Sequence, residues 1–210
     1  MGQGSQRRTR RVDVSETEPK PGVPARLIAA SILGRVLRAG AWSNVALRDI
    51  DLEESSDRAL VRMLVYETIR KLEIVDAGIE AVLDRPIATV EATVLDTMRI
   101  ATTEMFFSRS PNHAAVDTAV EAVKAAGHSR AAGFVNGVLR SVSRSNPPEM
   151  SGRLGAAFGM PDWLTETLVS AWGEGETIEF FSASAEAAPL AIRPRPGAAV
   201  PSVAAPGPVA

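Results

Sequence analysis

The chain has 210 residues, of which 45% are apolar, so it can bury the core of one domain with appended segments. With 23 Lys and Arg against 25 Asp and Glu, its net charge of −2 excludes a uniformly basic nucleic-acid binder. The absence of Cys excludes a disulfide scaffold, a cysteine-ligated zinc site and a cysteine nucleophile, and two His are too few for a histidine-rich metal site.

Aromatic residues make up only 5% of the chain, which argues against a surface that stacks many nucleic-acid bases. The longest apolar runs, such as 27–33, fall far short of the roughly 20 residues that span a bilayer. No hydrophobic run follows the N-terminal arginines, so a secretory signal is not predicted. We expect a soluble, cytoplasmic protein without a metal site.

Positive charge is concentrated at the N-terminus. Residues 1–40 hold eight basic and three acidic side chains, a net charge of +5, so the remainder carries −7. A basic head on an acidic body predicts a local contact with a polyanion. The alternative is that the head is only a solvated, disordered arm.

From residue 25 to 145 apolar residues recur at helical spacing, and no alternating strand pattern competes with it. The expected helices cover 25–38, 43–50, 56–72, 73–83, 89–107, 111–126 and 129–144. Ser56 is the predicted N-cap of the third, and Gly127 is expected to end the sixth. Seven helices joined by short loops predict an all-α bundle.

The segments around this bundle have different compositions. Residues 1–24 are expected to form a disordered basic arm, and 194–210, rich in Ala and Pro, a disordered tail. Residues 146–193 follow a break at Asn146-Pro147-Pro148 and are expected to form a linker. It would hold short helices at 161–172 and 175–185 and a strand at 189–193, which would begin a following region.

The residues offer little chemistry for an enzyme. His113 and His128 both lie at predicted helix starts, where a capping or surface role is the simpler interpretation. The acidic run 49–54 has no metal-loop spacing and is expected to be a solvated loop. Gly173-Glu174-Gly175 lacks the third glycine of a dinucleotide fingerprint and follows a helix. The residues therefore predict a non-catalytic helical domain with a basic N-terminal edge.

Three stretches in this order resemble the NusB-type RNA-binding domain. They are SDRAL with LVYETIR at 56–70, NHAAVDTAV at 112–120 and AGFVNGVLR at 132–140. The resemblance covers about 25–145 and implies an all-α bundle, in agreement with the periodicity. Phe-Val-Asn-Gly-Val-Leu is its most specific part.

Two groups carry this domain: free NusB antitermination factors and the N-terminus of RsmB/Sun-type rRNA cytosine-5 methyltransferases. The segments 161–164, 171–173 and 188–193 are similar to the linker of the methyltransferases. That family's catalytic half binds S-adenosylmethionine and attacks cytosine with a cysteine thiolate. This chain has no Cys and no room for such a half after Arg193, so we expect no methyl transfer and no cofactor. The resemblance thus implies the N-terminal portion of a methyltransferase, as a truncated product or a fragment.

The expected partner is RNA, ribosomal RNA for a methyltransferase portion. The alternatives are a stand-alone antitermination factor, which would add a protein partner, and a helical remnant without a ligand. The predicted RNA-binding residues are Arg7, Arg8, Arg10, Arg11, Arg26, Arg35 and Arg38. Arg35 and Arg38 share a helix face, whereas Arg26 lies about half a turn away.

Two residues of the most specific motif carry predictions of their own. Asn136, like Tyr66, has a polar group on a largely apolar helix, which favours a structural hydrogen bond over an RNA contact. Gly137 inside a helix is expected to permit a close helix crossing.

Overall fold

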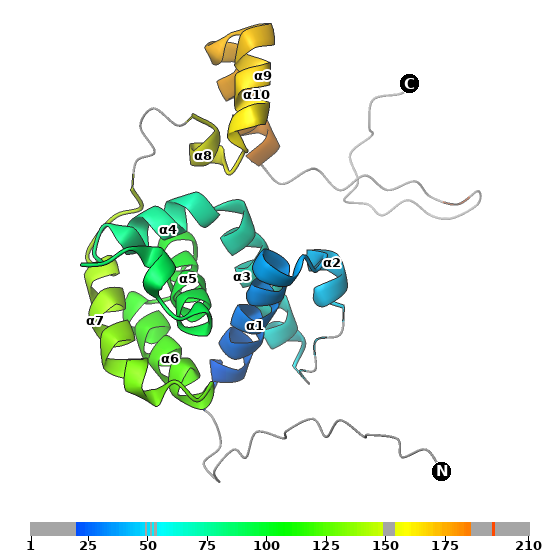
Figure 1. Ribbon diagram of the computed structural model, residues 1–210. Coiled ribbons are helices and arrows are strands. Elements are labelled where there is room, and N and C mark those ends of the chain that lie inside the picture. Colours follow the sequence, from blue (N-terminus) through cyan, green and yellow to red (C-terminus); the bar gives the residue numbers. More distant parts are fainter. Residues whose placement is uncertain are drawn as a thin grey trace, which may run out of the picture. The chain divides into compact units, whose positions relative to one another are not determined.

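The computed structural model describes residues 20–48, 50, 52, 54–148, 154–185 and 195. The chain divides into two compact units, Met1–Gly159 and Met160–Ala210 (Figure 1). The first unit holds helices α1 to α8 and the second holds α9 and α10. Within these described residues there are helices and turns but no strand, so the predicted all-α fold is confirmed.

Seven α-helices form the bundle of the first unit, as the periodicity predicts. They are α1 (Val23–Ala39), α2 (Ser43–Ala46), α3 (Ser55–Arg70), α4 (Leu72–Glu80), α5 (Ala92–Phe107), α6 (Asn112–Ala125) and α7 (Ala132–Val142). Short 3-10 turns precede two of them, η1 (Ile87–Thr89) and η2 (Ser129–Ala131). The short helix α8 (Leu154–Phe158) packs on α4.

Helix α5 is the centre of the bundle. It contacts α1, α3, α4, α6 and α7, and 11 of its 16 residues are buried. Figure 1 shows α5 enclosed by these neighbours. Because so much of its surface is covered, α5 buries polar side chains as well as apolar ones, and it determines where α1 can lie.

Two apolar clusters make up the core. One joins α4, α5, α6 and α7 and contains the apolar residues that recur at helical spacing in the fifth and seventh predicted helices: Val94, Met98, Ala101, Met105, Val135, Val138, Leu139 and Val142. The other joins α1, α2 and α3 to Ile100 of α5. Burial of these side chains is the main favourable contribution to folding.

Several helix ends are marked by proline or glycine, including the predicted end at Gly127. Pro24 occupies the first turn of α1, and Gly40 ends it with a left-handed φ of 65°, which a residue without a Cβ adopts at no steric cost. Gly127 follows α6 with a φ of 88°. The predicted cap at Ser56 is wrong: α3 already begins at Ser55, and the Ser56 hydroxyl donates to Glu54 Oε2 instead.

The prediction for Gly137 is also wrong. A Cβ at this position would have no atom within 4 Å, so no helix crosses closely there. Neither Asn136 nor Tyr66 has a side-chain hydrogen bond among the described residues, so the expected structural bonds are absent too. These positions lie at or near the surface of the bundle, which the periodicity alone did not indicate.

The second unit is a pair of helices, α9 (Asp162–Trp172) and α10 (Glu174–Ala185), close to the predicted ranges. Gly173 joins them with a φ of 84°, and the rings of Trp172 and Phe180 meet edge to face at 5.6 Å. The predicted strand at 189–193 lies outside the described residues.

Candidate nucleic-acid interface

Helix α1 carries three of the predicted RNA-binding arginines, and the structure gives each a different environment. Arg26, in the first turns, and Arg38, in the last turn, both reach carboxylates of α5. Arg35 points to solvent, and none of the described residues pairs with its guanidinium. Three arginines of one helix therefore differ in how available their charge is to a ligand.

Arg26 is held inside the protein. Its Nε donates to Glu104 Oε2 at 3.0 Å and its Nη2 donates to Glu104 Oε1, while Nη1 donates to the carbonyl of Gly22 at 3.0 Å. The Arg26 side chain is 12% exposed and that of Glu104 is 0% exposed. A buried carboxylate needs such a partner, because an unpaired charge in the interior is strongly unfavourable.

Arg38 belongs to a chain of ion pairs that links three helices. Its two Nη atoms donate to the two oxygens of Asp96, which is buried on α5, and this hydrogen bonding raises the pKa of Arg38. Asp96 also accepts from Arg99, which makes two bonds of 2.7 Å to Asp76 of α4. The Arg38 side chain remains 45% exposed, so its outer edge is open to solvent.

Gly34 makes room for the Arg38–Asp96 pair. A Cβ there would lie 2.3 Å from Arg38 Nη2 and 2.7 Å from Asp96 Oδ2, closer than atoms approach. The Arg38 guanidinium therefore reaches Asp96 by passing over Gly34, which has no side chain. At this position a side-chain contact, and not the backbone angle, favours glycine.

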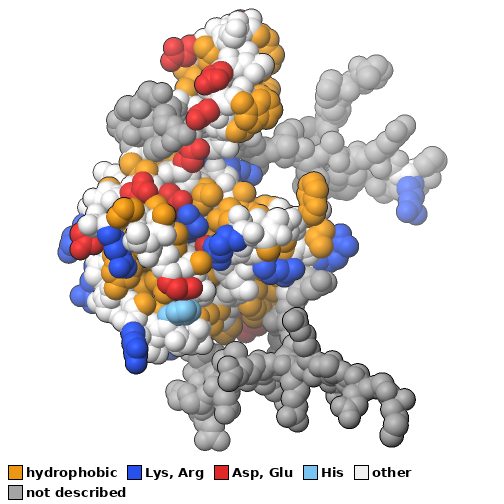
Figure 2. All heavy atoms as spheres, in the orientation of Figure 1, with side chains coloured by type: hydrophobic (Ala, Val, Ile, Leu, Met, Phe, Trp, Pro, Cys, Tyr) orange, Lys and Arg blue, Asp and Glu red, His pale blue; other side chains and the backbone are white. Residues whose placement is uncertain are grey.

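Arg35 and Arg38 line the same groove, of about 440 Å³, between α1 and the start of α5. Thr93, Asp96 and Ala126 line its other side, and Arg26 is not part of it. Figure 2 shows basic side chains gathered over α1 and α2 on the same face. The structure thus brings Arg35 and Arg38 together, as their spacing predicts, and separates them from Arg26. The four arginines of the arm, Arg7, Arg8, Arg10 and Arg11, lie outside the described residues.

The helical bundle of the first unit matches a known protein family. The profile described as the NusB family matches residues 23–144, which is more than half of the chain and spans α1 to α7. The chain belongs to the NusB family. This confirms the resemblance that the sequence motifs carry.

The NusB-family domain occurs in relatives that are much longer than this chain. The ribosomal RNA small subunit methyltransferase B of Xanthomonas campestris pv. campestris is 31% identical over 174 residues, which are 82% of this chain and 39% of the relative. The chain therefore spans well under half the length of that methyltransferase. The predicted relationship to the rRNA methyltransferase group is confirmed at this level.

Two solved structures share the fold. Thermotoga maritima NusB superposes with a TM-score of 0.55 at 22% identity, covering 61% of this chain and 94% of that chain. A chain from a structure titled "Crystal Structure of a Plectonemic RNA Supercoil" superposes with a TM-score of 0.52 at 23% identity, covering 57% and 91%. At these identities the likeness establishes the fold of the NusB-family domain.

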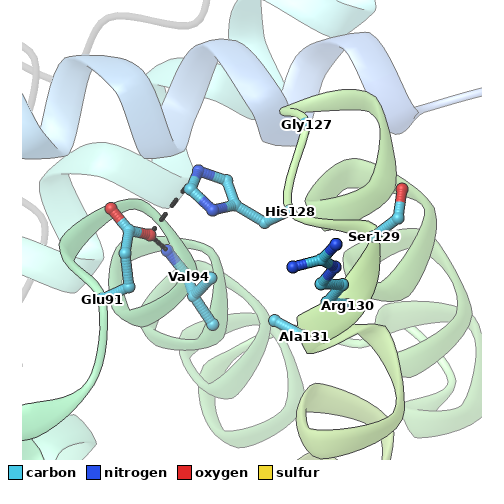
Figure 3. Close-up of a pocket in the computed structure, with 7 residues that line it drawn as sticks. All are labelled: Glu91, Val94, Gly127, His128, Ser129, Arg130 and Ala131. Carbon is cyan, nitrogen blue, oxygen red and sulfur yellow. Dashed lines mark hydrogen bonds and ion pairs between the residues drawn. The ribbon is translucent and has the colours of Figure 1, made fainter.

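A second pocket of the domain, of about 450 Å³, contains a histidine (Figure 3). Glu91 and His128 face each other there, with Oε2 and Nε2 3.6 Å apart, and Glu91 also accepts from the backbone N–H of Val94 at 2.9 Å. Burial raises the pKa of Glu91, but hydrogen bonds from Val94 and Thr93 and the nearby His128 outweigh it and hold that pKa below its usual value. His128 is thus placed at a helix start, beside a capping carboxylate.

The described residues contain no group of His, Asp and Glu that could hold a metal ion. Among the helices described, none is long and apolar enough to cross a membrane. His113 is exposed at the first turn of α6, as its position in the sequence suggests.

The sequence reasoning missed the partners of Arg26 and Arg38. Asp96 and Glu104 lie eight residues apart on one face of α5, with the buried Ile100 midway between them. An acidic residue on the buried face of a helix is the signal in the sequence that could have revealed these pairs, because buried carboxylates are nearly always paired.

Proposed function

We propose that this chain is the RNA-binding N-terminal portion of an rRNA (cytosine-C5) methyltransferase and acts in the cytoplasm on ribosomal RNA. The proposal rests on the share of this chain that aligns with the methyltransferase of Xanthomonas campestris pv. campestris. The alignment covers 82% of this chain, more than residues 23–144 can account for, so the similarity extends beyond the NusB-family domain. Helices α8 to α10 lie after residue 144, outside the part of the chain that matches the NusB family. A free NusB factor would therefore not account for them.

RNA binding is assigned to the basic edge of α1. No residue in the described part of the chain pairs with the Arg35 guanidinium, and Arg38 has an exposed edge on the same groove. Together with the arm residues Arg7, Arg8, Arg10 and Arg11, they would contact phosphates and release counterions. Arg26, the seventh predicted residue, is proposed to act by fixing the start of α1, where the arm departs, since Glu104 occupies its guanidinium.

We assign no methyl transfer to this chain. The resembled family uses a cysteine thiolate and S-adenosylmethionine bound on a parallel sheet. The chain has no Cys, and the described residues include no strand from which such a sheet could be built, so the residues present do not fit the cofactor. The proposed role is to hold RNA for chemistry done by another part of the methyltransferase.

A stand-alone antitermination factor is the second candidate. It is favoured by Thermotoga maritima NusB, 94% of whose length is covered by this fold. The coding sequence after Ala210 separates the two candidates: a catalytic half with a Cys supports the first, whereas its absence and a bound protein partner support the second.

The test is a titration of fluorescent rRNA fragments at several salt concentrations. The logarithm of the binding constant should fall with the logarithm of the salt concentration by about 0.7 for each phosphate contacted on a single strand. Removal of residues 1–12 should flatten this slope by about two to three contacts, and Arg35→Ala by about one.

Arg140→Ala serves as the matched control, because Arg140 is an exposed arginine of α7 on another helix. Its slope should equal that of the parent chain. If Arg140→Ala alone weakens binding, the RNA surface lies on α7 and the assignment to α1 is wrong. Turnover of labelled S-adenosylmethionine by the purified chain would overturn the non-catalytic assignment.

A further inference from the structure

We infer that Trp42 is a stacking platform for one unpaired RNA base, placed beside the arginines of α1. The inference rests on the proposed RNA binding and adds to it a residue and a ligand class: single-stranded RNA or an RNA loop, in place of a duplex. Trp42 lies between α1 and α2 and is 79% exposed, the most exposed large apolar residue among those described.

The backbone around Trp42 is fixed although the residue is exposed. On one side, Ala41 N–H donates to the carbonyl of Arg35 at 3.1 Å, after the left-handed turn at Gly40. On the other, the Trp42 carbonyl accepts from Val45 and Ala46 at 3.0 and 2.9 Å. A ring on a rigid support loses little conformational entropy when a ligand stacks on it.

The helix that follows is anchored in the core. Ala46 and Leu47 are buried in the apolar cluster of α1 and α3, whereas Val45 is half exposed and extends the apolar surface of Trp42. Exposure of Trp42 is therefore not a sign that α2 is detached. A base has an apolar face of similar size to the indole ring, which suits this small patch.

Basic side chains precede and follow Trp42 in the chain, ahead of the acidic run 49–54, and they favour a nucleic acid as the ligand. The hydrogen bond from Ala41 holds the residue before Trp42 against the turn of α1 that carries Arg35, and Arg38 is in the next turn. Arg48 follows α2 and is exposed, and no described residue pairs with its side chain. Figure 2 shows basic side chains next to hydrophobic ones over α2. Stacking on a ring with cations for the adjacent phosphates is how single strands are bound without base-edge contacts.

A second exposed tryptophan provides the contrast. Trp163 of α9 is 68% exposed, yet α9 and α10 contain five acidic residues and no Lys or Arg: Asp162, Glu166, Glu174, Glu176 and Glu179. Figure 2 shows acidic and hydrophobic side chains along this hairpin. Such a surface repels phosphates, so exposure alone does not make an RNA platform, and Trp163 is a matched control.

The test uses a variant in which Trp42 is the sole tryptophan, Trp163→Phe with Trp172→Phe. Its fluorescence should be quenched saturably by an unpaired RNA of about 12 nucleotides and much less by a duplex of the same sequence. In the parent chain, Trp42→Ala should weaken binding of the unpaired RNA by about 5-fold to about 150-fold, and Trp42→Phe by much less. Trp163→Ala should have no effect.

Salt dependence separates stacking from phosphate contact. Trp42→Ala should lower the affinity at every salt concentration without changing the slope, because stacking releases no counterions, whereas Arg35→Ala should flatten the slope. Unchanged affinity of Trp42→Ala, or an equal loss in Trp163→Ala, would overturn this inference and leave RNA binding in place. No binding of RNA by the parent chain would overturn the proposed function itself. Since Trp42 is exposed, an unchanged thermal transition should show that the variant is folded.

Discussion

The contact of α1 with α5 and the contact of α6 with α7 are built from different side chains. Ion pairs to buried carboxylates join α1 to α5, through Arg26 with Glu104 and the half-exposed Arg38 with Asp96. Between α6 and α7 the contact is mainly apolar, through a shared core cluster that contains Ala115, Ala119, Val123, Val135 and Leu139. One exposed hydrogen bond, from Asn112 Nδ2 to the carbonyl of Ser143 at 3.2 Å, adds to it at the end of α7. Charged, directional pairs thus dominate the first contact and apolar burial dominates the second.

The ion pairs determine how α1 lies on α5. Arg26 and Arg38 are about 18 Å apart along α1, and Asp96 and Glu104 about 12 Å apart along α5, at 1.5 Å per residue. The start of α1 pairs with the end of α5, and the end of α1 with its start, so the two helices run antiparallel. Two forked ion pairs at opposite ends of α1 fix both its direction along α5 and its register. Apolar packing is non-directional and specifies them less strictly.

Removal of a buried partner should have the largest effect. Glu104→Ala leaves the Arg26 guanidinium without its carboxylate, and we expect it to lower the free energy of unfolding by about 3–5 kcal/mol. Urea unfolding followed by circular dichroism measures this. Arg26→Met combined with Glu104→Leu, which removes both charges, should cost far less or even stabilise the fold. A loss under about 1 kcal/mol for Glu104→Ala would mean that the pair does not hold α1 in place.

Truncation of the apolar contact should come next. Leu139 is fully buried between α7 and its neighbours, and Leu139→Ala should cost about 2–5 kcal/mol through lost burial and a residual cavity. Leu139→Met, which nearly conserves volume, should cost less than about 1.5 kcal/mol in the same assay. An effect of Leu139→Met as large as that of the alanine variant would show that shape, and not burial, dominates here.

Replacing two helical glycines by alanine should change the stability of the fold in opposite directions. Gly34→Ala would place a Cβ against Arg38 and Asp96 and should destabilise the fold by about 1–2 kcal/mol. Gly137→Ala meets open space and should stabilise α7 by up to about 1 kcal/mol, because alanine favours a helix interior. Thermal unfolding of both variants tests the pair, and a stabilised Gly34→Ala would contradict the crossing of Arg38 over α1.

The smallest expected effect concerns pH. The pKa of Glu91 is lowered in the folded state, so its contribution to stability is present above the unfolded pKa of about 4.3 and is lost as pH falls through the folded value. Glu91→Gln should therefore reduce stability by about 0.5 kcal/mol at neutral pH, since the side chain is half exposed and screened. Unfolding measured from about pH 7 to about pH 3 should show the two proteins converging in acid. A difference that grows as the pH falls would contradict this assignment.

The sequence by itself predicted the helices and most of the core. Stripes such as Val135, Val138, Leu139 and Val142 repeat at helical spacing, and all four are buried. Periodicity, Pro and Gly act within a few residues, so a single sequence reveals them. The seven helices, the end of the sixth at Gly127 and the NusB motifs are information of this local kind. The prediction for Ser56 failed because α3 begins at Ser55, after Glu54, and no side chain caps its first turn.

Only the tertiary structure decided which arginines of α1 have a charge available to a ligand. Arg26, Arg35 and Arg38 are the same residue type on one amphipathic helix, yet two have partners 78 and 58 residues away. Those partners come from α5, and their distance depends on how two helices pack, which helical periodicity does not specify. The exposure of Gly137 and of Trp42 was decided in the same way, because a side chain is buried or exposed by what other parts of the chain place against it.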